Sequence, residues 1–236
     1  MKAAVCLSGY LNSKKDPNSK GVNGFLHLKK HVLDKVDCDV FIHSWDMENM
    51  DLIKDLYSKY AVSYEFDVQK KFRNDLPTGN GYAEQSSILS QFYSVSKSFS
   101  LMRDSEKKYD WVIRSRFDVG QINRLSSGPF NPNNPFAVQC INFDPTLDRN
   151  KLYLANWQYF DTEGPPDMWF YSSQENMTKF CDFYDIIDRD MVLGYAMEKW
   201  AGKKNNGIVN AIKCWKWALL ESGLWSKMKP LETYWE

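Results

Sequence analysis

The chain has 236 residues and carries 30 lysines and arginines against 30 aspartates and glutamates, so its formal net charge is zero. This length suits one α/β domain with elaborations and is short for two complete domains. The even balance excludes a chain-wide electrostatic attraction to nucleic acid or to an anionic membrane. A partner must therefore be recognised at a local site, and nucleic acid is not expected as one.

The cysteines and the apolar runs indicate a compartment. The five cysteines lie far apart, without a CxxC pair or a histidine at ligand spacing, and they indicate reduced thiols in a cytosolic protein. The N-terminal residues turn polar too soon for the apolar region of a signal peptide. No later run reaches the roughly 18 apolar residues of a membrane span. We therefore expect a soluble, cytoplasmic protein without a transmembrane segment.

The first half alternates strand and helix patterns. Compact apolar runs predict strands, and apolar residues at steps of three or four predict helices. This alternation predicts a mostly parallel sheet with helices on both faces. The expected elements are a strand at 3–10, a helix at 24–35, a strand at 38–46, a helix at 47–60, a strand at 61–68, a loop at 70–82, a helix at 84–108 and a strand at 110–119.

The second half changes character. Prolines and asparagines between residues 125 and 150 indicate a loop-rich excursion. We expect a single α/β domain over residues 1–236, with a mixed-sheet elaboration in its C-terminal half. The elements expected there are a short strand at 135–143, a strand at 151–160, and helices at 174–190 and 206–221.

Three predicted strands end in polar residues, in the segments "SGY", "HSWD" and "RSRFD". Ligands of open α/β sheets bind beyond the carboxyl ends of the strands, so these segments should meet at one cleft. Alternation along the fourth strand puts Arg114, Arg116 and Asp118 on one side. Two guanidinium groups suit a pyrophosphate, and the carboxylate suits a divalent metal or orients an arginine. The alternative is a structural salt bridge between Asp118 and the arginines.

Five blocks spread over residues 2–180 carry a family resemblance. They are "AAVCLSGYL", "DVFIHSWD", "SQFYSVSKSFSLM", "YDWVIRSRFDV" and "PPDMWFYSSQENMTKF". In this order the chain resembles a family of small glycosyltransferase-like proteins of the GT-A fold. That family is found in large DNA viruses, phages and bacterial surface-polysaccharide loci, and is loosely similar to the WavE type of lipopolysaccharide enzyme.

The resemblance implies a Rossmann-like three-layer α/β/α sandwich. Residues 1–120 would form the nucleotide-binding half, and residues 121–236 the acceptor-binding half. The implied activity is transfer of a sugar from a nucleotide diphosphate donor to a hydroxyl of a glycan or glycoprotein acceptor. A viral member would act in the host cytoplasm.

The resemblance also implies a divalent metal, Mn²⁺ or Mg²⁺, on the donor diphosphate. GT-A enzymes usually hold it with two aspartates that flank one residue. Here Arg116 stands at the first of these positions and only Asp118 matches. A weakly held, water-completed ion and no ion at all both remain open, and in the second case the arginines would neutralise the phosphates.

The expected donor-binding residues lie at the strand ends and on one face of the long helix. Tyr10 would stack on the base, His43 contact phosphate or base, Asp46 bind a ribose hydroxyl and Lys97 contact phosphate. The alternatives are an ordinary turn after the first strand, side chains buried in the core and a solvated surface lysine. The full set is Ser8, Gly9, Tyr10, His43, Trp45, Asp46, Gln91, Ser94, Lys97, Arg114 and Arg116.

The expected catalytic residues are Asp118, beside the donor diphosphate, and Asp167. Asp167 is the expected base, because inversion at an anomeric carbon needs a carboxylate to take the acceptor proton. It begins a strand or a helix after a long loop, and a cap or turn role is the alternative. Other carboxylates considered for this role are Asp161, Glu163 and Glu198. An aromatic platform for the acceptor could come from Trp157, Trp169 and Tyr171, for which core packing is the alternative.

Two further functions compete with glycosyl transfer. A nucleotidyltransferase uses a similar sheet, but "LSGYLNSKKD" only partly imitates its glycine-rich, basic phosphate loop. A non-catalytic carbohydrate-binding protein on the same fold is favoured by the missing second aspartate.

Overall fold

The computed structural model of the chain describes residues 1–11, 21–74, 84–120, 140–156, 164–181, 183–192 and 211–231. In this part seven strands form one sheet in the order β3-β2-β1-β4-β6-β5-β7. Neighbouring strands pair in parallel except where β6 meets β4 and β5. The strands are β1 (Lys2–Gly9), β2 (Asp37–Ser44), β3 (Ala61–Phe66), β4 (Trp111–Arg116), β5 (Leu152–Ala155), β6 (Trp169–Ser172) and β7 (Met228–Leu231).

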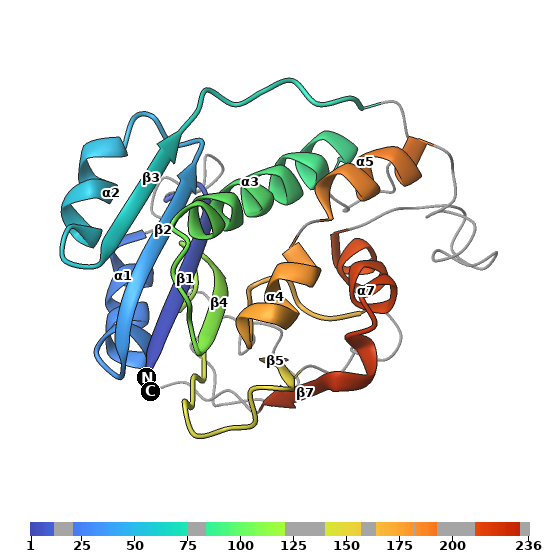
Figure 1. Cartoon of the computed structure of the whole chain (residues 1–236). Helices are drawn as coiled ribbons and strands as arrows, with labels where there is room; N and C mark the ends of the chain where they lie inside the picture. Colours follow the sequence, from blue (N-terminus) through green and yellow to red (C-terminus); the bar gives the residue numbers. More distant parts are fainter. Residues whose placement is uncertain are drawn as a thin grey trace, which may run out of the picture.

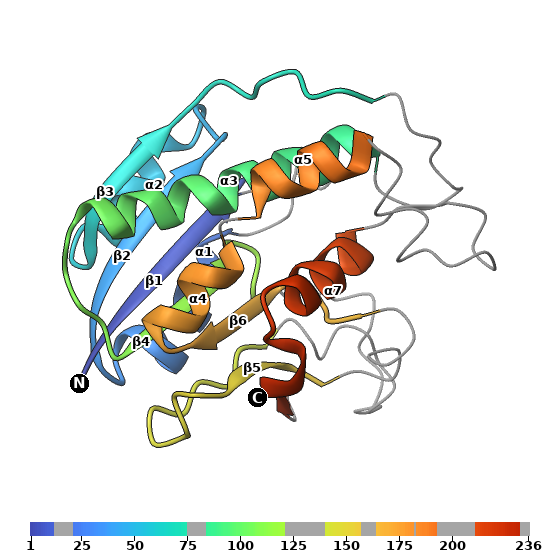
Figure 2. The same cartoon turned by 45° about the vertical axis from the view of Figure 1, so that its right-hand side comes forward.

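Helices cover both faces of this sheet, as Figures 1 and 2 show. α3, α4 and α7 pack on one face, and α1 and α2 pack on the other. The helices are α1 (Gly21–Leu28), which continues as the π-helical turn η1 (Lys29–Leu33), α2 (Met50–Tyr57), α3 (Gln85–Asp104), α4 (Gln174–Cys181), α5 (Tyr184–Val192), α7 (Ala211–Glu221) and the 3₁₀ turn η5 (Trp225–Lys227).

The two faces of the sheet bury separate hydrophobic clusters, which follow from the alternation of side chains along each strand. In β1, Ala4 and Cys6 join the cluster under α3, whereas Ala3, Val5 and Leu7 join the cluster under α1 and α2. The α/β class and the mostly parallel sheet that the sequence predicts are thus confirmed. The topology is compatible with a Rossmann-like fold.

The first four predicted strands and the long helix are present, with shifted ends. The fourth strand ends at Arg116, so Asp118 lies in the following turn and not on the strand as predicted. The predicted helix at 174–190 is two helices instead of one. α4 contacts β4 and β6 while α5 lies along α3, which one straight helix would not achieve (Figure 2).

The second half differs from the prediction at two further places. Residues 140–143, the described part of the strand predicted at 135–143, form no strand, although Ile141 and Phe143 are buried. β7 was not predicted, because its four residues include a proline and carry no clear alternation. The C-terminal end predicted for the strand at 151–160 and the start of the helix at 206–221 lie outside the described residues.

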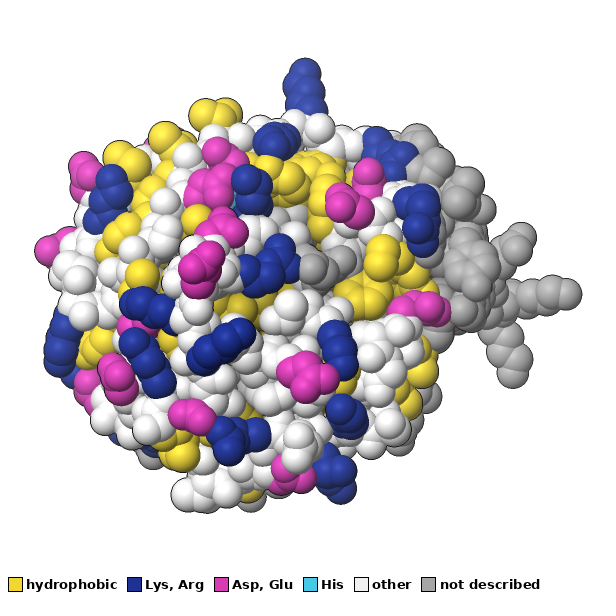
Figure 3. All heavy atoms as spheres, in the orientation of Figure 1, with side chains coloured by type: hydrophobic (Ala, Val, Ile, Leu, Met, Phe, Trp, Pro, Cys, Tyr) yellow, Lys and Arg dark blue, Asp and Glu magenta, His cyan; other side chains and the backbone are white. Residues whose placement is uncertain are grey.

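Charges of both signs are interspersed on the face shown in Figure 3. This agrees with the zero net charge and with a ligand recognised by a local site. No helix in the described ranges combines the length and the apolar character that a membrane crossing requires.

Candidate functional site

A cavity of about 460 Å³ lies beyond the carboxyl ends of β1 and β4, against the first half of α3. This is the edge at which open α/β sheets bind their ligands, and the volume suits a small molecule. Its walls also include residues that follow β2 and β3 and one that precedes β6. The lining residues are Ser8, Gly9, Tyr10, Trp45, Gln69, Ser87, Ile88, Ser90, Gln91, Ser94, Arg114, Arg116, Asp118, Asp167 and Ala211.

Gly9 forms the rim of the cavity at the end of β1. Its φ of 106° lies in a region that side-chain-bearing residues rarely adopt. The Gly9 N–H donates to Ser94 Oγ at 3.1 Å, and its carbonyl accepts from Ser44 Oγ at 2.8 Å. The turn is thereby tied to both β2 and α3, which fixes the adjacent Ser8 and Tyr10 in the cavity wall.

A polar chain closes the side of the cavity next to β3. Tyr10 Oη donates to Gln69 Oε1 at 2.7 Å, and Gln69 Nε2 donates to Ser90 Oγ at 3.2 Å. Trp45 adds an aromatic wall that stacks on Tyr93 with 5.5 Å between ring centroids. The Trp45 indole N–H is buried and has no hydrogen-bond partner within the described ranges. It is therefore a buried donor whose hydrogen bond no described group supplies.

Arg116 holds the two acids of the cavity. It makes a two-pronged pair with Asp118, with N–O distances of 2.8 and 2.6 Å, and its Nη1 lies 3.3 Å from Asp167 Oδ2. Burial opposes its charge, but both carboxylates raise the pKa of Arg116 above its ordinary value. The salt bridge weighed from the sequence therefore exists. It borders the cavity instead of being sealed in the interior, because the Arg116 side chain is 35% exposed.

The strand order brings Asp167 to this cluster. β6 pairs antiparallel with β4, and the Arg116 N–H donates to the Met168 carbonyl at 3.2 Å, so the residue before Met168 reaches the end of β4. The Asp167 carboxylate accepts a hydrogen bond from Gln91 Nε2 as well as from Arg116. Burial would raise the pKa of Asp167, but Arg116, Arg114 and Gln91 hold it below its usual range. The group is therefore ionised at neutral pH.

Arg114 is the least satisfied group of the cavity wall. Its side chain is fully buried, and Nη1 donates to the backbone carbonyl of Asp167. Its Nε and Nη2 have no partner in the part of the chain that the structure describes. The guanidinium lies over the Trp215 ring at 4.9 Å. Burial lowers the pKa of Arg114 to about 10, so the group stays cationic at neutral pH and presents unmet donors.

Three predicted donor contacts do not line the cavity. His43 is fully buried, with Nδ1 2.7 Å from Ser94 Oγ, and burial lowers its pKa although Asp67 opposes the shift. Asp46 accepts hydrogen bonds from the Leu11 N–H and from the Asn49 amide, so it fastens the loop after β2. Lys97 pairs with Glu65 of β3 instead of pointing into the cavity.

Core packing, the alternative to an acceptor platform, holds for the two described candidates, Trp169 and Tyr171. Trp169 is 1% and Tyr171 0% exposed, because alternation along β6 turns both into the cluster under α1 and α2. The other candidates for acceptor or base roles, Trp157, Asp161, Glu163 and Glu198, lie outside the described residues.

Several residues in and beside the cavity were not predicted from the sequence. Gln69, Ser87 and Ser90 line the cavity, but their types occur in any loop or helix and gave no signal. Glu65 and Asp67 lie beside His43, and the ligand atoms of these three residues are within 4.8 Å of one another, so the group could hold a metal ion. Glu65 near the end of β3 and Asp67 just after it are two residues apart, which was a signal, although the partner strand could not be predicted from it.

Asp118 does not match a two-acid metal motif. Both of its carboxylate oxygens are engaged by Arg116, and the position two residues earlier is Arg116 itself. A metal ion on Asp118 would have to displace this guanidinium, so the residues present at the end of β4 fit an anion better than a cation.

Comparison of the chain with models of known protein families finds no match, and comparison with curated proteins finds none. The function therefore has to be argued from the cavity.

Proposed function

We propose that the chain is a GT-A-like glycosyltransferase that moves a sugar from a nucleotide diphosphate donor to a hydroxyl of a glycan or glycoprotein. The observation that carries the proposal is the buried Arg114 guanidinium, which lines the cavity with Nε and Nη2 unpartnered among the described residues. A buried cation with unmet donors is costly, and a bound diphosphate would supply both the charge and the acceptors.

Arg116 extends this anion site. Its two-pronged pair with Asp118 has the geometry that also recognises a phosphate, so a diphosphate can compete for the same nitrogens. Trp45 and Tyr10 offer a ring and polar atoms to the remainder of the donor.

Asp167 is suited to receive the acceptor proton. It is ionised, borders the cavity, and is held in place by Gln91 and Arg116. In the reaction the bond between the anomeric carbon and the diphosphate oxygen breaks, and the nucleoside diphosphate leaves with the electron pair. The acceptor oxygen bonds to the anomeric carbon, and its proton passes to the Asp167 carboxylate.

A non-catalytic binding protein is the second candidate. It is favoured by the pairing of both acids with Arg116, which lowers the basicity of Asp167. Such a protein would bind its ligand in the same cavity without releasing a nucleoside diphosphate.

A ligand panel tests the proposal. Thermal unfolding of the full chain is followed with nucleoside diphosphates and nucleotide sugars, each with and without Mn²⁺. A ligand at a hundred times its Kd should add about 2.7 kcal/mol to the unfolding free energy. Release of nucleoside diphosphate from the stabilising donor then separates the transferase from the binding protein. If no nucleotide raises the unfolding temperature, the cavity is not a donor site.

A further inference from the structure

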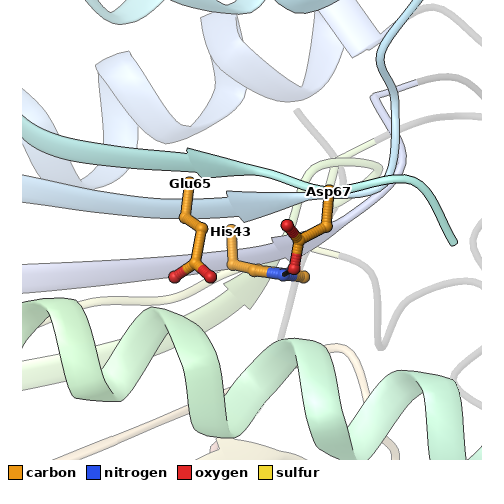
Figure 4. A group of neighbouring side chains, drawn as sticks. All are labelled: His43, Glu65 and Asp67. Carbon is orange, nitrogen blue, oxygen red and sulfur yellow. Dashed lines mark hydrogen bonds and ion pairs between the residues drawn. The ribbon is translucent and has the colours of Figure 1, made fainter. Parts of the chain in front are cut away.

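We propose that His43, Glu65 and Asp67 bind a divalent transition-metal ion, at a site distinct from the charged end of β4. The three side chains come from the carboxyl ends of β2 and β3, and Figure 4 shows them projecting to the same side of the sheet, towards α3. None of them lines the cavity. The site does not depend on the proposed glycosyl transfer.

Backbone register brings the three ligands together. His43 is the direct partner of Glu65 across the parallel pair β2 and β3, and Asp67 follows Glu65 by two residues, so it returns to the same face. The His43 Nε2 atom lies 3.4 Å from Asp67 Oδ2, and all three ligand atoms fall within 4.8 Å of one another. Bonds of about 2.0 to 2.2 Å to a shared ion in tetrahedral geometry place ligand atoms about 3.3 to 3.6 Å apart, so the distance between His43 and Asp67 already fits. The longer Glu65 side chain can close the remaining gap.

The His43 ring is oriented by groups outside the cluster. Nδ1 lies 2.7 Å from Ser94 Oγ, which accepts the Gly9 N–H at 3.1 Å and lies 3.4 Å from the His43 carbonyl. If the Ser94 hydroxyl donates to that carbonyl, Nδ1–H donates to Ser94. The Nε2 lone pair then faces Asp67, the arrangement that a metal-ligating histidine needs. Because the ring is fully buried, it cannot turn away without breaking this contact.

The charges around the cluster favour a cation. In the described part of the chain a single ammonium group, that of Lys97, forms an ion pair with these two carboxylates, and it binds Glu65 at 2.6 Å. The Glu65 and Asp67 side chains are 30% and 32% exposed, so an ion can reach them from solvent. A metal ion would displace Lys97 from Glu65 and add the second positive charge.

The ligand types indicate the class of ion. One imidazole nitrogen with two carboxylate oxygens suits Zn²⁺ or Mn²⁺. Ca²⁺ needs six to eight oxygen ligands, and Mg²⁺ is bound chiefly through oxygens and water. Three protein ligands would leave at least one position of the ion to water.

Calorimetric titration of the chelator-treated full chain with Zn²⁺, Mn²⁺, Mg²⁺ and Ca²⁺ tests the site. We expect one equivalent of Zn²⁺ or Mn²⁺ to bind, and Asp67→Asn to weaken that binding at least tenfold. Asp118→Asn, the matched change in the cavity, should leave it unaltered. Both positions are partly exposed, so both variants should fold, which circular dichroism would check.

Any of three results would overturn the site. One is loss of the ion in Asp118→Asn with retention in Asp67→Asn, which would move the metal to the end of β4. A second is absence of nitrogen coupling in pulsed electron paramagnetic resonance of bound Mn²⁺, since His43 would then not be a ligand. Failure of every ion to bind would also overturn the proposal, while leaving the nucleotide cavity untouched.

Discussion

The charged clusters at the ends of β4 and β3 contain similar groups, but the first is suited to an anion and the second to a cation. At β4, two acids face Arg116 and the fully buried Arg114, whose remaining donors are unmet among the described residues. At β3, two acids face one lysine and a buried, neutral histidine. Among the described residues, the first cluster therefore has more hydrogen-bond donors than acceptors occupy, and the second has more carboxylate oxygens than cations occupy. The same sheet edge thus offers an anion site beside a cation site.

The cation type accounts for much of this difference. The Arg116 guanidinium is planar and donates two hydrogen bonds to the Asp118 carboxylate, a geometry that also suits a phosphate. Lys97 is a single point of charge on a flexible stem and holds one oxygen of Glu65. A ligand can therefore displace Lys97 more easily than it can displace Arg116.

The largest effect is expected from the Asp167 carboxylate. Asp167→Asn removes the proton acceptor but keeps the size of the side chain, so kcat should fall by about 100- to 10,000-fold. Donor binding should change far less, and the two quantities are separated by kinetics and calorimetry with the stabilising donor. A loss below about tenfold would assign the base to another carboxylate.

Arg114→Met removes the anion anchor. Charge-assisted hydrogen bonds contribute roughly 1.5 to 3 kcal/mol, so nucleotide affinity should fall about 10- to 100-fold. Because an apolar side chain of similar volume replaces a buried charge, the unfolding free energy without ligand should be equal or higher. Arg149→Met, a change at an exposed arginine outside the cavity lining, is the matched control. Unchanged nucleotide affinity in Arg114→Met would remove the main support for the donor site.

Lys97→Met tests the proposed cation site at the end of β3. It removes the ammonium that competes for Glu65, so Zn²⁺ or Mn²⁺ should bind up to about fivefold more tightly, as an ion pair of at most about 1 kcal/mol predicts. Nucleotide affinity should stay the same, because Lys97 does not line the cavity. If Lys97 instead contacts phosphate, Lys97→Met will bind the nucleotide more weakly, and its affinity for the metal ion will not change.

The change expected at Gly9 acts chiefly on stability and only secondarily on binding. A side chain there meets no atom within 4 Å, but the φ of 106° makes any other residue strained, so Gly9→Ala should lose about 1 to 2 kcal/mol of unfolding free energy. Gly223→Ala is a matched control with positive φ and open space. Both variants should be less stable in denaturant titrations. Only Gly9→Ala should also weaken nucleotide binding, because Ser8 and Tyr10 flank it in the cavity wall.

Local sequence patterns were enough to predict the strands and the long helix of the first half. Apolar runs and helical spacing predicted β1 to β4 and α3, because strand and helix periods are properties of short segments. The polar residues after these strands were expected at one sheet edge, and Ser8, Tyr10, Arg114 and Asp118 do line a common cavity. Their binding of a donor stays a prediction.

Tertiary structure alone decided the partners of these residues. Asp167 joins Arg116 because β6 inserts antiparallel between β4 and β5, an order that no local pattern encodes. Glu65 and Asp67 meet His43 because β2 and β3 pair in one particular register. A charged side chain binds whichever opposite charge the folded chain brings within about 4 Å, and that distance depends on strand order and register, which the sequence specifies only through the whole fold.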